Sequence, residues 1–144
     1  MKIERLMRVD VGTVREVNAL LRQLSGSFTA KKCTVGYLRS VVGSGQSEVW
    51  VARENGHIVG MATLALVLKP GGIVARVEDV VVDERARGKG IGRKVVDKII
   101  ERAKKHRASF VVLSSRPSRA AANALYAKLG FKIHGTNLYQ KRLS

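Results

Sequence analysis

The chain has one cysteine, two prolines and no long apolar run. Its single cysteine, Cys33, cannot form an intrachain disulfide and favours a reducing compartment. No apolar stretch reaches the ~18 residues that span a bilayer, and the first residues lack the apolar core of a signal peptide. With 144 residues, 45% of them apolar and 26% charged, the composition excludes a disordered or collagen-like chain. We therefore expect one cytoplasmic domain over residues 1–144, with no membrane partner.

Acidic residues are scarce. The 27 lysines and arginines outnumber the 11 aspartates and glutamates, which gives a net charge of +16 and an isoelectric point of about 10.8. Such a chain attracts polyanions, whether nucleic acid, an anionic membrane surface or a phosphate-rich cofactor. Aromatic residues make up only 5%, too few for an obvious base-stacking platform, and no nucleic-acid-binding motif occurs. We expect no specific nucleic-acid partner, and a basic nucleic-acid-binding module without catalysis remains the alternative function.

Apolar periodicity predicts the element order β-α-α-β-β-β-α-β-α-β-β. Apolar positions at helical spacing predict helices over residues 13–24, 35–42, 91–103 and 118–129. Short alternating or continuous apolar runs predict strands over residues 3–9, 48–53, 58–68, 74–82, 110–113, 131–133 and 138–142. The pair Asn55-Gly56 suits the type I′ turn of a hairpin between the second and third strands. This pattern is typical of an α/β fold of the α+β type, with a mostly antiparallel sheet and helices on its faces.

A glycine-rich turn joins the strand over residues 74–82 to the helix that follows it. The turn reads Arg87-Gly88-Lys89-Gly90-Ile91-Gly92-Arg93. Glycines let an anion approach the free backbone N–H groups of a helix N-terminus, and the three cations add charge-assisted hydrogen bonds. The dinucleotide-binding pattern fails because Arg93 occupies its third glycine position, and the P-loop pattern fails because Gly88-Lys89 lacks the earlier glycine and the following hydroxyl. We predict a phosphate-binding turn, and a basic turn without a ligand is the alternative.

Two adjacent acids interrupt the apolar strand over residues 74–82. Side chains alternate across a strand, which predicts that Glu78 and Asp79 point to opposite faces of the sheet. Ordinary surface ion pairs with lysines are the alternative for both carboxylates. The three histidines show no metal-ligand spacing among themselves or with Cys33, so we predict no metal site.

The combined pattern resembles the GNAT superfamily of acyl-CoA-dependent N-acyltransferases. The cofactor signature of that family, Q/R-x-x-G-x-G/A, is met by Arg87, Gly90 and Gly92. Its second signature, an asparagine and a tyrosine on the next helix before Gly-Phe, is met by Asn123, Tyr126, Gly130 and Phe131. The resemblance implies a single GNAT-type N-acetyltransferase domain over residues 1–144. It also implies a mixed, mostly antiparallel sheet of six or seven strands, flanked by about four helices.

The same resemblance implies acetyl-CoA as the cosubstrate. Its pantetheine arm is expected to pair with the main chain of Val80 and Val82, like an added strand. Asn123 is expected to hydrogen-bond the arm from the other side. The diphosphate is expected on the turn formed by Arg87, Gly88, Lys89, Gly90, Ile91, Gly92 and Arg93.

The chemistry of amine acetylation suggests roles for the remaining residues. An amine attacks only when neutral, so a base must remove its proton at neutral pH. Glu78 is the candidate base, and Asp79 and a water molecule remain alternatives. A main-chain N–H near Val81 or Val82 is the candidate oxyanion donor. Both residues are also expected to contact the cofactor. By resemblance, Tyr126 contacts the cofactor and protonates the leaving thiolate; the alternative is a tyrosine that only packs the last helix.

Within the superfamily, residues 76–82 and 87–89 look particularly like glucosamine-6-phosphate N-acetyltransferases. Those enzymes carry a carboxylate after the fifth strand, where this chain has Ser114-Ser115-Arg116. The acceptor therefore stays open between glucosamine 6-phosphate and another small-molecule or peptide amine, and a homodimer also remains open. The loops over residues 25–29 and 135–137 are expected to face the acceptor.

Overall fold

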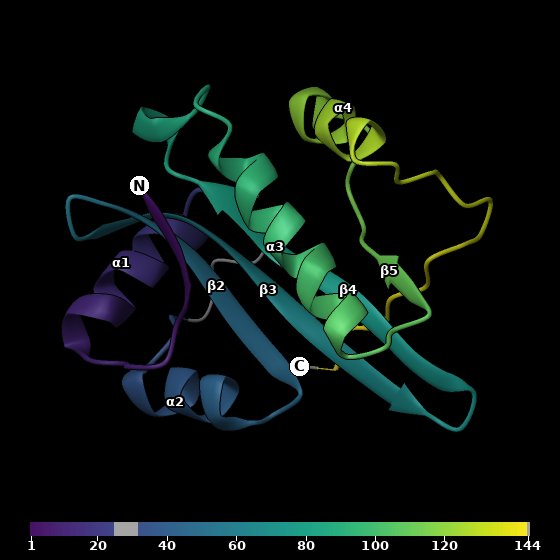
Figure 1. The fold of residues 1–144 in the computed structure, drawn as a ribbon, viewed down its shortest axis with the longest axis horizontal. Coiled ribbons are helices and arrows are strands. Elements are labelled where there is room, and N and C mark those ends of the chain that lie inside the picture. Colours follow the sequence, from purple (N-terminus) through teal and green to yellow (C-terminus); the bar gives the residue numbers. More distant parts are fainter. Residues whose placement is uncertain (25–31, 144) are drawn as a thin grey trace. The chain divides into compact units, whose positions relative to one another are not determined.

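The computed structural model describes residues 1–24 and 32–143, which contain four α-helices and five strands (Figure 1). In chain order the elements are β1 (Lys2–Arg5), α1 (Val11–Leu21), α2 (Val35–Gly43), β2 (Ser47–Glu54), β3 (His57–Lys69), β4 (Gly72–Val82), the 3₁₀ turn η1 (Glu84–Ala86), α3 (Ile91–Lys105), β5 (Phe110–Val112) and α4 (Ala120–Lys128). The chain divides into two compact units, Met1–Leu113, which holds the five strands, and Ser114–Ser144, which holds α4. None of the described helices is long and apolar enough to cross a membrane.

The first unit is built on one five-stranded sheet in the order β1-β2-β3-β4-β5. Neighbouring strands run antiparallel, except for β4 and β5, which are parallel. This arrangement confirms the predicted mixed, mostly antiparallel α/β fold with four helices. The hairpin of β2 and β3 turns at Asn55 and Gly56, whose φ angles of 51° and 81° are positive, as the predicted type I′ turn requires.

The expected sheet of six or seven strands has five, because the predicted strands over residues 131–133 and 138–142 are absent from the described part of the chain. Residues 132–143 are exposed, which leaves their apolar side chains no buried face to occupy. Between the two stretches, Thr136 N donates to the carbonyl of His134 at 2.9 Å and closes a three-residue turn. Alternation over three to five residues does not suffice to form a strand without a partner.

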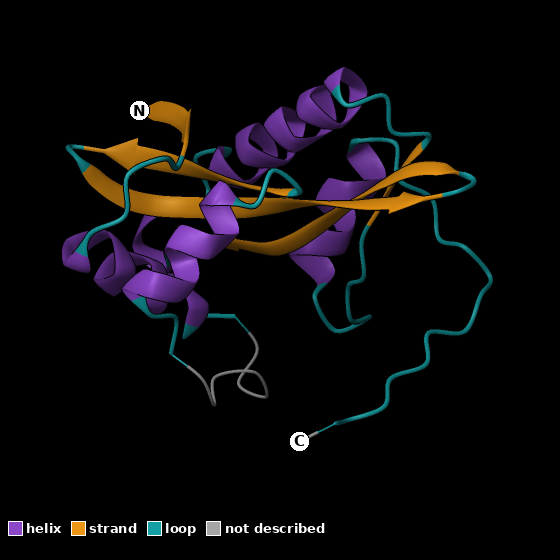
Figure 2. Ribbon diagram, turned by 90° about the horizontal axis from the view of Figure 1, so that it is seen from below, coloured by secondary structure: helices purple, strands orange, loops and turns teal. Residues whose placement is uncertain are grey.

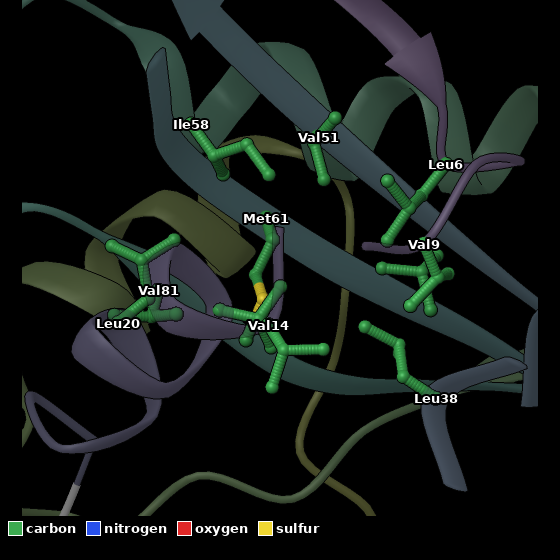
Figure 3. Packing of buried hydrophobic residues seen from close by; sticks show 11 residues of the cluster. Leu6, Val9, Val14, Leu20, Leu38, Val51, Ile58, Met61 and Val81 are labelled. Atoms are coloured by element: carbon green, nitrogen blue, oxygen red, sulfur yellow. The ribbon is translucent and has the colours of Figure 1, made fainter. Parts of the chain in front are cut away.

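Helices cover both faces of the sheet in the first unit. α1 and α2 lie against one face, and α3 lies against the other (Figures 1 and 2). We name these the α1/α2 face and the α3 face. The α1/α2 face buries the cluster in Figure 3, which consists of Leu6, Val9, Val14, Val17, Leu20, Leu38, Val49, Val51, Ile58, Met61 and Val81. The α3 face buries Ala52, Ala62, Leu64, Ala75, Val77, Ala86, Ile91, Val95, Ile99 and Ala103.

α3 is fastened to the sheet at both ends. Near its start, Ile91 packs so closely on β3 that a Cβ added at Gly60 would lie 2.9 Å from Ile91 Cγ2. Near its end, Arg102 donates from Nε and Nη2 to the buried carboxylate of Glu48 on β2, at 2.9 and 3.0 Å. His106 Nε2 lies 2.7 Å from the same carboxylate. These contacts hold the N-terminus of α3 at a fixed place over the sheet.

The second unit contains α4 and the residues that follow it. Tyr126 is buried, and its ring meets that of Phe131 edge to face, with the centroids 5.9 Å apart. Gly130 has a φ of 90° just after the helix, the left-handed conformation in which a glycine commonly ends a helix.

Candidate active site

The second half of β4 has an open edge. β5 pairs only with the first half of β4, so residues 77–82 have no partner strand on that side in the described part of the first unit. Asp83 N donates toward β3, to Val59 O at 2.8 Å. Since successive residues of a strand direct their backbone groups to alternate edges, the N–H and C=O groups of Val82 and Val80 point to the open edge. This edge can therefore take an extended ligand as an added strand.

A β-bulge interrupts β4 at Asp79. β3 contributes one residue, Ala62, opposite two residues of β4, Asp79 and Val80. Asp79 has a φ of 51°, in the left-handed region that aspartate tolerates better than most residues. Because the bulge resets the alternation, Val77 and Val80 both pack on the α3 face. Glu78, next to Val77 in the regular part of the strand, therefore lies on the α1/α2 face. Asp79 interacts electrostatically with Cys33, which packs on the α1/α2 cluster, so Asp79 lies on that face too. The prediction that these carboxylates point to opposite faces is wrong, and the inserted residue is the reason.

The two bulge carboxylates have different surroundings. Glu78 Oε1 accepts a hydrogen bond from Arg76 Nε at 2.9 Å, so its charge is paired. Asp79 forms no ion pair with the described residues. Its pKa is raised, first by desolvation of the carboxyl and then by the negative charge of Glu78. Asp79 is therefore the carboxylate that an incoming cation would stabilise most.

The chain segment that enters α2 lies beside the bulge. Asn18 on α1 fixes the backbone of Cys33 through two hydrogen bonds of 2.9 Å, one from Cys33 N to Oδ1 and one from Nδ2 to the Cys33 carbonyl. Desolvation raises the pKa of Cys33, and the charge of Asp79 raises it further. Cys33 packs on the α1/α2 cluster, which places it on the same side of the sheet as the two carboxylates.

A glycine turn with left-handed backbone leads from β4 into α3. Gly88 and Gly90 have φ angles of 84° and 77°, which glycine adopts without strain. Gly90 is the N-cap of α3, and no side chain caps the helix. The first hydrogen bond of the helix runs from Lys94 N to Gly90 O at 3.1 Å, so the N–H groups of residues 91–93 have no protein acceptor in the described structure. The predicted strand–turn–helix arrangement is present, and its geometry suits an anion.

Three cations surround this turn. Arg87 Nε donates to Val82 O at 3.0 Å, at the open edge of β4. Lys89 Nζ lies 3.6 Å from Glu54 Oε2. Arg93 Nε lies 3.8 Å from the carboxylate one turn further along α3. The three side chains are exposed, and their charges add to the positive end of the α3 dipole.

Two contacts near the site involve residues that sequence reasoning missed. Asn18 holds Cys33, and Gln23 Oε1 accepts a hydrogen bond from Glu84 N at 2.9 Å, which ties the end of α1 to the start of the glycine turn. Neither residue belongs to a recognisable motif, so no sequence signal could have selected it. The predicted acceptor loop over residues 25–29 lies outside the described residues. Among the described residues, no group of three or more histidine, cysteine or acidic side chains could hold a metal ion.

The remaining two predicted site residues lie on α4, in the second unit. Asn123 Nδ2 donates to two backbone carbonyls just before α4, at 2.9 and 3.4 Å, so its amide is engaged within its own unit. Tyr126 is 6% exposed, and desolvation raises its pKa, against a smaller lowering by Arg119. A tyrosine in this state keeps its proton at neutral pH and can donate it.

Relatives of the chain are identified by sequence. The profile of the Acetyltransferase (GNAT) family matches residues 18–131. The rice protein named "Probable glucosamine 6-phosphate N-acetyltransferase 2" (Oryza sativa subsp. japonica) is 44% identical over 71 residues, which are 49% of this chain and 41% of that protein. The human N-acetylaspartate synthetase is 36% identical over 89 residues, which are 61% of this chain and 28% of that protein. The chain therefore spans less than half the length of these curated relatives.

Solved structures share the fold. The crystal structure of glucosamine-6-phosphate N-acetyltransferase from Arabidopsis thaliana matches with a TM-score of 0.79, and the match covers 97% of each chain at 24% sequence identity. At this identity, the likeness establishes the common fold.

Proposed function

Since the chain belongs to the acetyltransferase (GNAT) family, we propose that it transfers an acetyl group from acetyl-CoA directly to a primary amine of an acceptor. The start of α3 carries the proposal: Gly88 and Gly90 place uncapped N–H groups beside the open edge of β4. Uncapped N–H groups with cations around them fit a diphosphate, and an open strand edge fits the amide groups of a pantetheine arm. We assign this activity to one N-acetyltransferase domain over residues 1–144.

The first unit offers two sets of contacts for coenzyme A. The diphosphate would be held by the turn residues Arg87, Gly88, Lys89, Gly90, Ile91, Gly92 and Arg93. Val82 O already accepts a hydrogen bond from Arg87. The pantetheine arm would therefore pair with the N–H of Val82 and with the outward groups of Val80. When bound, the thioester supplies the activated acyl carbon.

The same alternation of backbone groups restricts the oxyanion donor. The N–H of Val81 points toward β3, where Val81 is paired with Met61. The outward N–H groups of Val82 and Val80 are the ones that face the open edge. We therefore assign the stabilisation of the oxyanion to one of these two N–H groups, where a preorganised donor has most effect.

We propose that the bulge carboxylates take the proton of the acceptor amine, directly or through a water molecule. An amine with a pKa of about 10.4 is protonated at neutral pH. Sequence reasoning selects Glu78 as the base. The geometry adds Asp79, whose raised pKa brings it closer to the working pH of a general base. The pairing of Glu78 with Arg76 leaves Asp79 as the carboxylate that an ammonium group would approach.

Tyr126 is the proposed acid. A thiol of pKa about 8.5 leaves more readily when it is protonated as it departs. Tyr126 is buried, and its raised pKa keeps it in the protonated form that a donor needs. Asn123, three residues earlier on α4, is the proposed second contact of the pantetheine arm.

We propose a small-molecule amine that carries an anionic group as the acceptor, with glucosamine 6-phosphate as the specific alternative to test first. The names of the two relatives, a glucosamine 6-phosphate N-acetyltransferase and an N-acetylaspartate synthetase, both refer to amines of this class. The net charge of +16 attracts such molecules to the protein.

A screen of amines with acetyl-CoA, read by the release of free thiol, tests the proposal. Glucosamine 6-phosphate and aspartate come first, followed by unphosphorylated amino sugars, polyamines and a peptide amine. We expect acetyl-CoA-dependent thiol release with at least one amine, and an acetylated product by mass spectrometry. If no amine gives turnover and calorimetry detects no coenzyme A binding, the proposal fails and the nucleic-acid-binding module without catalysis is favoured.

A further inference from the structure

The positive charge of the chain is distributed unevenly. All 11 acidic residues lie between Glu4 and Glu101, and residues 102–144 contain ten lysines and arginines but no acidic residue. The second unit, Ser114–Ser144, holds six of these ten cations. One molecule of acetyl-CoA on the glycine turn of the first unit would leave this charge unexplained.

Several cations of the first unit pair with acidic side chains. Glu101, for example, lies 3.0 Å from Lys98 Nζ and 3.5 Å from Lys105 Nζ. The second unit has no acidic side chain that could neutralise a cation within the unit. Its exposed cations are Arg116, Arg119, Lys128, Lys132, Lys141 and Arg142. Their mutual repulsion is relieved when a polyanion binds.

Exposed apolar side chains accompany these cations. Ile133 and Leu138 are 102% and 76% exposed. Tyr139, which stands between Lys132 and Lys141 in the sequence, is 86% exposed. An exposed aromatic ring with cations along the same segment is the combination that binds single-stranded nucleic acid, because bases stack on the ring and phosphates meet the cations.

An anionic membrane fits the second unit less well. Helices that lie on membranes need a face of large apolar residues. Apart from Lys128, the exposed positions of α4 hold alanines instead, at Ala120, Ala121, Ala124 and Ala127. Residues 131–143 contain no helix in the described structure. A basic segment without regular secondary structure is typical of chains that order on binding RNA.

We propose that the second unit binds single-stranded nucleic acid without sequence specificity. Arg119, Lys128, Lys132 and Lys141 contact phosphates, and the ring of Tyr139 stacks on a base. This binding goes beyond the proposed acetyl transfer and does not depend on it.

Fluorescence anisotropy with a labelled uridine dodecamer of RNA tests the proposal on the full chain. Four phosphate contacts give a slope of log Kobs against log salt of about −2.8, so affinity falls about 50-fold between 50 and 200 mM salt. The double variant Lys132→Ala/Lys141→Ala loses two contacts, and its slope changes to about −1.4. Tyr139→Ala weakens binding by about tenfold and leaves the slope unchanged.

A matched variant separates this site from an effect of net charge alone. Arg15→Ala/Arg22→Ala removes two exposed cations from α1 and the residue after it, and we expect it to bind the RNA like the wild type. Far-UV circular dichroism and coenzyme A binding show whether each variant is folded. An equal loss of affinity in both double variants, or no RNA binding at 50 mM salt, would overturn the proposal.

Two further experiments, a competition with coenzyme A and a vesicle-binding assay, identify the ligand of the second unit. We expect saturating coenzyme A to leave the RNA bound, because the residues proposed to hold the RNA differ from those proposed to hold coenzyme A. Displacement of the RNA by coenzyme A would place it on the glycine turn and overturn the proposal. Binding to vesicles with about 30% phosphatidylserine but not to RNA would also overturn it, in favour of a membrane surface.

Discussion

At the bulge of β4, one extra residue brings two carboxylates to the same face of the sheet and gives them different surroundings. Glu78 is paired with Arg76 at 2.9 Å, whereas Asp79 has no ion-pair partner among the described residues and has a raised pKa. An unpaired carboxylate of this kind is stabilised by an approaching ammonium group and can then accept its proton. The proposed acetyl transfer depends on this asymmetry.

Substitution of either carboxylate tests the base. Asp79→Asn removes the charge but keeps a residue that tolerates the left-handed backbone, so the bulge should persist. A base works only when deprotonated, so wild-type kcat/KM should rise as pH increases through the raised pKa of Asp79. We expect the substitution of the true base to lower kcat/KM by about 10²–10⁴ and to abolish this rise. Steady-state kinetics of Asp79→Asn and Glu78→Gln between pH 5 and 9 provide the measurement.

The control for both variants is Glu101→Gln, which neutralises an exposed, ion-paired carboxylate on α3 outside the site. Its pH profile should match that of the wild type. If Asp79→Asn and Glu78→Gln both keep the alkaline rise, neither bulge carboxylate is the base.

Tyr126→Phe tests the acid. The variant keeps the ring that packs on Phe131 and removes only the hydroxyl. We expect kcat to fall by about 10²-fold or more, with the KM for acetyl-CoA nearly unchanged, because the lost proton transfer acts in the transition state. Tyr139→Phe, at an exposed position, is the matched control. Full turnover in Tyr126→Phe would mean that the tyrosine only packs the helix.

Sequence reasoning selected the acidic pair and the glycine turn but not the conformation of the pair. The bulge depends on how two long strands align in space, and the tolerance of aspartate for a positive φ was its only local signal. Asn18 and Gln23 were missed for a similar reason. Their partners lie 15 and 61 positions away in the sequence, and such contacts follow from the fold alone.

Among the elements, α3 is the one that was predicted best. Its apolar residues recur every four positions, and the helix runs over Ile91–Lys105 where residues 91–103 were predicted. The hairpin of β2 and β3 was predicted equally well, because Asn55-Gly56 determines its turn locally. The prediction of two strands after α4 was wrong, because a strand needs a partner strand and an alternating sequence in one segment does not provide one.

The ion pair between Arg102 on α3 and Glu48 on β2, which we call the α3 anchor, gives a prediction of stability. Glu48 is 3% exposed, and its loss would leave Arg102 without its carboxylate partner. Removing one member of a buried ion pair costs about 3–5 kcal/mol, so Glu48→Gln should lower the free energy of unfolding by that amount at pH 7. Urea denaturation measures the change. Glu101→Gln, at a surface pair, should cost no more than about 1 kcal/mol. An equally small effect for Glu48→Gln would show that the α3 anchor does not stabilise the fold.

The same anchor should weaken in acid. Burial alone would raise the pKa of Glu48, but hydrogen bonds from Arg102, His106 and Trp50 outweigh it and lower the pKa to about 2. A folded-state pKa below the ordinary value of 4.5 means that the stabilisation is present above pH 4.5 and is lost as pH falls from there through about 2. The wild type should therefore lose more stability than Glu48→Gln between pH 5 and 3. Equal losses would show that Glu48 is not the titrating group.

Over the whole molecule, charge and chemistry are divided between two units. The first unit carries every acidic residue, the open edge of β4 and the uncapped start of α3, and the second carries Tyr126 and six lysines and arginines without any acidic side chain. Composition predicted the attraction to anions, but a count of charges does not reveal that all acidic residues precede residue 102 in the sequence. The proposed acetyl transfer requires that the start of α3 receives the diphosphate of coenzyme A.

Amide NMR tests that claim most directly. Coenzyme A is titrated into the ¹⁵N-labelled protein, and pantetheine, which lacks the diphosphate, is titrated in parallel. We predict that coenzyme A moves the N–H signals of Ile91, Gly92 and Arg93 downfield, as new hydrogen bonds to phosphate require, and that pantetheine leaves them in place. Saturation with coenzyme A while these three signals stay unchanged would contradict it.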